Sequence, residues 1–162
     1  MPEQRTIERA RRDKREGKSA STQAGEFVRE EIEHIREGKH GARSTKQAIA
    51  IGLSKARRAG VKLPPSEDAP AQTKRKARQD IEAGEHPHKP AAKRARATKK
   101  ALKKEPTRAA SKTALSRQAK KAASKRTAAD RSAAARKAAR TKGATGRKAA
   151  ARKAARTRQR GG

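Results

Sequence analysis

The sequence predicts a mainly α-helical protein, in which a small αα-hairpin follows a short N-terminal helix and precedes a long, largely disordered basic tail with a helix-forming tendency. Three observations lead to this prediction. Most large apolar side chains fall between residues 25 and 65, Lys and Arg dominate the remainder, and Phe27 is the sole aromatic residue. A chain with so few large apolar side chains is expected to bury too little surface to order its whole length.

The N-terminal segment, residues 1–18, is expected to form a basic helix or arm. Its residue types favour helix by intrinsic propensity. Ile7 is the only large apolar residue between residues 3 and 16. We therefore expect this helix to be solvated and frayed.

The hairpin domain is predicted over residues 19–65. In its first helix Val28, Ile32 and Ile35 recur at i, i+4 and i+7, which places them on one face beside Phe27. Gly38 is a plausible stop, because glycine tolerates the left-handed conformation that often ends a helix.

The second hairpin helix has clearer boundaries. Ser44 followed by Gln47 matches a capping box near its start. Gly52 leaves room for close approach of a backbone, and Gly60 fits the position after the helix, with Val61 folding back on its last turn. The predicted hairpin core consists of Phe27, Val28, Ile32, Ile35, Ile49 and Leu53.

Residues 66–88 are predicted to form a linker with one short helix, which Asp68 would cap and Gly84 would stop. Residues 89–162 are predicted to form the disordered Ala/Lys/Arg-rich tail. The chain carries 47 Lys and Arg against 16 Asp and Glu, a net charge of +31. The tail contains an internal repeat, AAARKAART, at residues 133–141 and 149–157. These repeats lack the apolar faces that solenoid repeats stack.

A long block of positive charge without an apolar core is typical of a segment that binds a polyanion. Lys and Arg neutralise phosphates and release condensed counterions, and the loss of mutual repulsion would favour partial helix on binding. Base-specific recognition is poorly supported, since the N-terminal half of the second hairpin helix offers only Lys46. The candidate nucleic-acid-binding residues are Arg57, Arg58, Lys93, Arg94, Arg96, Lys99, Lys100, Lys103, Lys104, Lys120, Lys121, Lys125, Arg126, Arg136, Lys137, Arg140, Arg147, Lys148, Arg152, Lys153 and Arg156.

Several classes of function lack the residues they need. The chain has no cysteine, so disulfides and thiolate metal sites are excluded. No nucleophile–base arrangement, P-loop or dinucleotide motif is present, so we predict no enzyme and no cofactor. His34, His40 and the His86–His88 pair are expected to be solvated or packed side chains, and no metal site is predicted. No apolar run is long enough to span a membrane, so we expect a cytoplasmic protein.

Two resemblances add to this interpretation. Residues Ser21–Pro65, STQAGEFVREEIEHIREGKHGARSTKQAIAIGLSKARRAGVKLPP, resemble a family of small bacterial proteins carried as an uncharacterised domain, whose members are often labelled DNA-binding or plasmid-stabilisation proteins. The tail, from Lys89-Pro90-Ala91-Ala92-Lys93 onward, is similar to histone H1 tails and to bacterial histone H1-like proteins. These resemblances imply a bacterial protein that associates with DNA.

The leading hypothesis is a histone H1-like, nucleoid-associated DNA-binding protein that contacts phosphates with low sequence specificity. One alternative is a plasmid-maintenance or toxin–antitoxin adaptor, whose hairpin would bind a protein partner through the acidic face Glu26–Glu37. Another is an RNA- or ribosome-associated basic protein, although DNA is favoured over RNA. Residues 19–65 are also the candidate surface for a homodimer.

Overall fold

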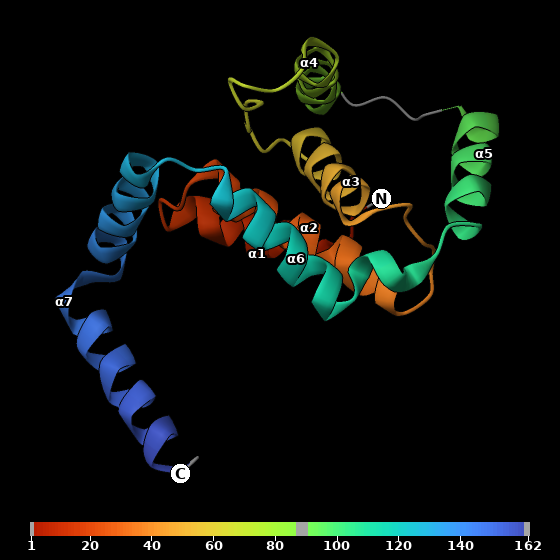
Figure 1. Ribbon diagram of the computed structural model, residues 1–162. Helices are drawn as coiled ribbons and strands as arrows, with labels where there is room; N and C mark the ends of the chain where they lie inside the picture. The colour runs from red at the N-terminus through yellow and green to blue at the C-terminus, as the bar shows by residue number, and fades with distance from the viewer. Residues whose placement is uncertain (1, 87–90, 161–162) are drawn as a thin grey trace. The chain divides into compact units, whose positions relative to one another are not determined.

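The computed structural model describes residues 2–86 and 91–160, and all regular structure within them is helical (Figure 1). The contacts divide the chain into a hairpin unit, residues 1–118, and a C-terminal unit, residues 119–162. None of the described helices is long and apolar enough to cross a membrane. The elements are α1 (Gln4–Arg15), α2 (Ala20–Arg36), α3 (Thr45–Arg58), α4 (Ala71–Glu85), α5 (Ala92–Lys103), the 3-10 turn η1 (Thr107–Ala110), α6 (Lys112–Ser124) and α7 (Ala128–Arg160).

The predicted αα-hairpin is present as α2 and α3, and its ends are built as the residue types indicate. Gly38 and Gly60 follow the two helices with φ of 74° and 89°. The Ser44 side chain accepts the Gln47 N–H at 3.2 Å. Gln47 in turn accepts the N–H of Arg43 at 2.7 Å, one residue before the position expected for a capping box.

Two apolar clusters hold the hairpin unit together. In the first, Ile32 and Ile35 of α2 meet Ala48 of α3, with Val28 partly buried at its margin. The second surrounds Phe27, which is 1% exposed. Leu53 packs against the second cluster while partly buried, and Ile49 is half-buried and outside both clusters. Five of the six predicted core residues therefore contribute to the two clusters.

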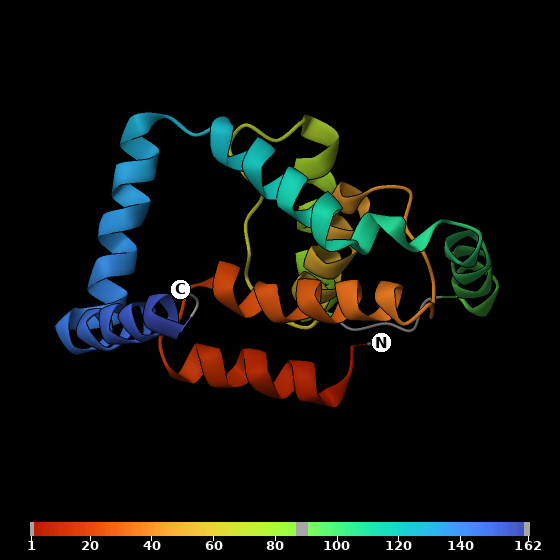
Figure 2. The same ribbon diagram turned by 60° about the horizontal axis from the view of Figure 1, so that its bottom comes forward.

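The expectation that the N-terminal helix is solvated and frayed was wrong. α1 lies antiparallel beside α2 (Figure 2), and its Ala10 is buried in the Phe27 cluster, with Ile7 packed against that cluster. The backbone N–H of Glu3 donates to Glu30 Oε2 of α2 at 3.1 Å. Ile7 is sufficient as the one large apolar residue of α1, because the small side chain of Ala10 allows α1 and α2 to approach closely.

Helix α4 packs on α3 through a buried carboxylate. Asp80 is 2% exposed and accepts the Ser54 hydroxyl at 2.7 Å and Arg58 Nε at 2.9 Å. Pro70 occupies the N-cap position, so the predicted Asp68 cap is not formed. Gly84 lies inside the helix and does not stop it; a Cβ there would collide with the carbonyl oxygen of Arg57.

The predicted long disordered tail was wrong. Residues 92–103, 112–124 and 128–160 are helical, while residues 87–90 and 161–162, including Lys89 and the Pro87, His88 and Pro90 positions, lie outside the described residues. Ala, Lys and Arg rank among the best helix formers, so these segments form helix although their apolar residues are mostly Ala. Gly143, with φ 64° and ψ 174°, divides α7 into two helical segments, and each carries one copy of the repeat.

Part of the predicted tail also completes the hairpin core. Ala109 and Ala110 of η1 are buried in the first cluster, and Leu115 of α6 packs against it. Thr45 Oγ1 donates to Ala109 O at 2.7 Å, and Arg36 Nε donates to Ala110 O at 2.9 Å. The hairpin therefore gains apolar cover from residues more than sixty positions further along the chain.

Candidate nucleic-acid interface

The predicted phosphate-binding residues after Arg58 are all exposed. They lie on α5 and its C-cap, at the end of α6, in the connection that follows α6, and on both segments of α7. These residues are Lys93, Arg94, Arg96, Lys99, Lys100, Lys103 and Lys104; Lys120 and Lys121; Lys125 and Arg126; Arg136, Lys137 and Arg140; and Arg147, Lys148, Arg152, Lys153 and Arg156.

The second segment of α7 gathers several cations on one side. An α-helix turns about 100° per residue, so Lys148, Arg152, Lys153 and Arg156 lie within about 140° of one another around the helix axis. Between them stand Ala residues, and no apolar stripe is formed. Arg147 is partly engaged, because its Nη1 donates to Ala139 O at 2.6 Å across the break at Gly143. This segment presents charge rather than a packing surface.

The C-terminal unit has almost no acid to balance these cations. Its sequence contains 16 Lys and Arg and a single acid, Asp130. Asp130 caps the start of α7, where the Thr127 hydroxyl and N–H donate to its Oδ2 at 2.6 and 3.1 Å. These hydrogen bonds hold the pKa of Asp130 below its ordinary value. Among residues 119–159, no carboxylate forms an ion pair with a Lys or Arg.

In the hairpin unit, by contrast, several cations face carboxylates. Arg29 Nε lies 3.2 Å from Glu33, Lys62 Nζ lies 3.3 Å from Glu85, and Arg43 Nε lies 3.8 Å from Glu105. The cations available to a polyanion therefore include those of α5 and of the C-terminal unit.

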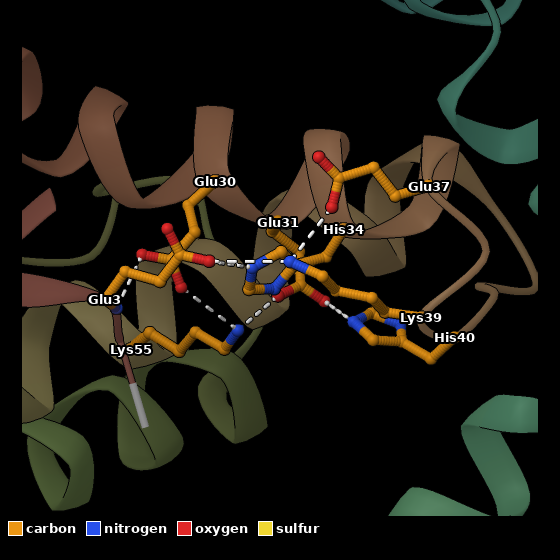
Figure 3. A network of polar contacts seen from close by, with 8 residues as sticks. All are labelled: Glu3, Glu30, Glu31, His34, Glu37, Lys39, His40 and Lys55. Atoms are coloured by element: carbon orange, nitrogen blue, oxygen red, sulfur yellow. Dashed lines mark hydrogen bonds and ion pairs between the residues drawn. The ribbon is translucent and has the colours of Figure 1, made fainter. Parts of the chain in front are cut away.

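The acidic face predicted between Glu26 and Glu37 is partly turned inward. Glu30 and Glu31 have side chains only 4% and 0% exposed, and both face Lys55 of α3, at 3.8 and 2.6 Å (Figure 3). Periodicity placed these residues opposite the apolar face, but α1 and α3 cover that side of α2. Two of the carboxylates proposed to meet a protein partner are thus occupied within the unit.

Arg57 and Arg58 are tied into the packing of the hairpin unit. Arg57 Nε donates to Leu63 O at 2.9 Å, and Arg58 Nε donates to Asp80 Oδ1 at 2.9 Å. Their exposure differs, with Arg57 half-buried and Arg58 exposed. Their contact with phosphate stays a prediction.

One group of basic residues was missed by the sequence reasoning. Arg5, Arg9, Arg12 and Arg15 of α1 line one shallow depression together with Glu8. Their spacing of three and four residues is the signal that could have identified them, because such residues share one helix face. They form a second basic surface, on the hairpin unit.

Residues 11–67 match the model of a protein family described as "Family of unknown function (DUF6496)". The match covers the end of α1 and the whole α2–α3 hairpin, and it stops before α4. The hairpin is thus similar to an uncharacterised domain family. No curated protein and no solved structure matches the chain.

Proposed function

We propose that this chain is a non-enzymatic, nucleoid-associated DNA-binding protein that contacts phosphates with low sequence specificity. The observation that carries the proposal is the set of exposed cations on residues 119–159, among which no ion pair to a carboxylate forms. A cation that is not already paired gains most from a phosphate. α5 contributes a further run of exposed bases to the same role.

Counterion release supplies the driving force for such binding. DNA carries a condensed layer of small cations, and each Lys or Arg that neutralises a phosphate releases them into solution. A helix that gathers several cations on one side can contact several phosphates at once. Because phosphates are identical in every sequence, contacts of this kind carry no sequence information.

The distribution of aromatic residues favours duplex over single-stranded nucleic acid. Single strands are commonly held by stacking of bases on exposed aromatic side chains. The sole aromatic residue of the sequence, Phe27, is 1% exposed in the core of the hairpin unit. Affinity must therefore come from the backbone charges, which are densest on a duplex.

The experiment is a salt series with the full-length protein and two unrelated DNA duplexes of equal length, followed by fluorescence anisotropy. We expect equal affinities for the two duplexes and a steep linear fall of log K with log salt. A matched RNA duplex serves as competitor. Binding confined to one duplex, binding independent of salt, or displacement by RNA at far lower concentration than by DNA would contradict the proposal.

A further inference from the structure

The turn between α2 and α3 brings three metal-ligating side chains together. Glu31 and His34 lie one turn apart on α2, and His40 belongs to the turn that follows (Figure 3). One ligand atom from each lies within 4.8 Å of the other two. The sequence showed the two histidines near this turn but gave no sign of a converging carboxylate, which the helical spacing and the turn now supply.

Glu31 is a buried carboxylate whose hydrogen-bonding capacity is not satisfied. Its side chain is 0% exposed, and neither carboxylate oxygen accepts a hydrogen bond of good geometry. Lys55 Nζ lies 2.6 Å from Oε2, so that oxygen has an ionic neighbour. Oε1 faces His40 Nε2 at 3.3 Å. A buried anionic oxygen in this position calls for a cation.

Both histidines are oriented by acceptors on their other ring nitrogens. His40 Nδ1 lies 3.1 Å from Gly41 O, and a proton on Nδ1 would leave an Nε2 lone pair facing Glu31 Oε1. Two lone pairs at that distance repel unless a cation lies between them. His34 Nε2 lies 2.9 Å from Glu3 Oε1. Metal-bound histidines almost always hold such a carbonyl or carboxylate on the second nitrogen.

The charges around the cluster also favour a divalent cation. The network of Figure 3 sets four carboxylates against two ammonium groups, namely Glu3, Glu30, Glu31 and Glu37 against Lys39 and Lys55. With neutral imidazoles these residues carry a net negative charge, and it stays negative when Arg5, Arg9 and Glu33 of the adjoining cavity are counted. A cavity of about 100 Å³, lined by Glu3, His34 and Lys39 among others, adjoins the cluster at His34.

We propose that Glu31, His34 and His40 bind a divalent transition metal, with Zn²⁺ as the ion that best fits. Two imidazoles and one carboxylate are ligands that zinc accepts, whereas Mg²⁺ and Ca²⁺ prefer oxygen alone. Neighbouring ligands of a tetrahedral zinc lie about 3.3 Å apart, given metal–ligand bonds of about 2.0–2.1 Å. The Glu31 Oε1 to His40 Nε2 distance is 3.3 Å. The bound ion would clamp the α2–α3 turn, and the fourth position would hold water.

The test uses untagged full-length protein titrated with Co²⁺, a spectroscopic substitute for zinc, followed by competition with Zn²⁺. We expect one Co²⁺ per chain with the visible d–d bands of a tetrahedral site, lost when one equivalent of Zn²⁺ is added. His40→Gln should abolish the bands. Glu3→Gln, which removes the carboxylate that orients His34 and pairs with Lys39, should weaken the affinity about 10- to 100-fold.

His86→Gln is the matched control, because His86 is exposed and lies outside the cluster. It should leave the bands and the affinity unchanged. Bands that persist in His40→Gln, or that disappear in His86→Gln, would overturn the proposal. If His40→Gln unfolds, as circular dichroism would show, the exposed Glu3→Gln variant decides: an affinity equal to that of the wild type overturns the site.

Discussion

Gly52 of α3 lies directly against the backbone of Val28 of α2. A Cβ placed on Gly52 would come within 2.6 Å of Val28 Cα, a separation that real Cβ atoms do not show. The absence of a side chain at this position therefore sets how closely the two hairpin helices pack. The same contact brings Glu31 of α2 within reach of Lys55, which lies one turn beyond Gly52 on α3.

Gly52→Ala should destabilise the hairpin unit by about 1–3 kcal/mol, because the added methyl group must push α2 and α3 apart. The free energy of unfolding is measured by urea denaturation followed by circular dichroism. Gly25→Ala is the matched control, since Gly25 is an exposed position of α2 with nothing within 4 Å of its hypothetical Cβ. That control should gain about 0.5–1 kcal/mol from helix propensity. Equal effects of the two substitutions would show that the helices are not in close contact at Gly52.

Thr45→Val tests whether η1 belongs to the hairpin core. Valine keeps the shape of threonine but removes the hydroxyl that donates to Ala109 O, so this buried carbonyl loses its partner. We expect a loss of about 1–3 kcal/mol in the free energy of unfolding. Thr73→Val, at an exposed position of α4, should change it by less than about 0.5 kcal/mol. A Thr45→Val variant as stable as Thr73→Val would place η1 outside the core.

The lowered pKa of Asp80 predicts that the stability of the protein depends on pH. Burial tends to raise the pKa of Asp80, but hydrogen bonds from Ser54, Lys76 and Arg58 outweigh it and hold the pKa below its ordinary value of 3.8. A carboxyl whose pKa is lower in the folded state stabilises the protein above its unfolded-state pKa of about 3.9. This contribution is lost as the pH falls through the lower, folded-state pKa.

Asp80→Asn should therefore cost about 1–3 kcal/mol at pH 7, and the difference from the wild type should shrink as the pH falls below about 4. Urea denaturation at a series of pH values measures it. Asp68→Asn, at an exposed turn position, should follow the wild type throughout. A difference between wild type and Asp80→Asn that stays constant down to the lowest pH would contradict the assigned role of the Asp80 carboxylate.

The local sequence could predict those features of the hairpin that depend on the chemistry of neighbouring residues. Ser44, Gly38 and Gly60 mark helix ends through their own backbone and side-chain preferences, and the structure confirms all three. The burial of Phe27, Ile32 and Ile35 followed from helical periodicity. These predictions needed no knowledge of which segments meet in space.

The features that escaped prediction depend on contacts between distant segments. Asp80 joins α4 to α3 across 22 residues from Arg58, and Thr45 reaches Ala109 across 64. Glu31 was placed on an exposed face because nothing local shows that α3 covers it. For the tail, charge repulsion and the lack of a core predict disorder, but helix propensity prevails and residues 92–103, 112–124 and 128–160 are helical. The cluster of Glu31, His34 and His40 was not predicted for the same reason as the burial of Glu31.

We attribute the break in α7 at Gly143 to the backbone conformation of this glycine. Its φ of 64° and ψ of 174° fall in a region open essentially to glycine alone. Gly143→Ala should therefore restore one continuous helix. Because the chain has no cysteine, spin labels on Ala134→Cys and Ala154→Cys can report the distance. An uninterrupted helix separates these positions by about 30 Å, and the wild type should give a shorter distance.

Gly146→Ala provides the control for this measurement. Gly146 has no positive φ, and a Cβ there meets only the flexible side chain of Lys142, at 3.1 Å. The distance between the labels should stay that of the wild type. If Gly143→Ala also leaves the distance unchanged, the break at Gly143 is not a property of its backbone conformation.

The most direct test of the account compares two triple variants, one that neutralises unpaired cations and one that neutralises the same number of paired cations. The α7 triple combines Lys148→Gln, Arg152→Gln and Lys153→Gln. The control triple, Arg29→Gln, Arg43→Gln and Lys62→Gln, removes the same charge from cations that face Glu33, Glu105 and Glu85. Binding of both variants to one DNA duplex is measured across a salt series. The account predicts that the α7 triple lowers the slope of log K against log salt by about 0.9 for each lost phosphate contact, about 2.7 in all, while the control changes it far less. Equal slopes for the two triples would contradict it.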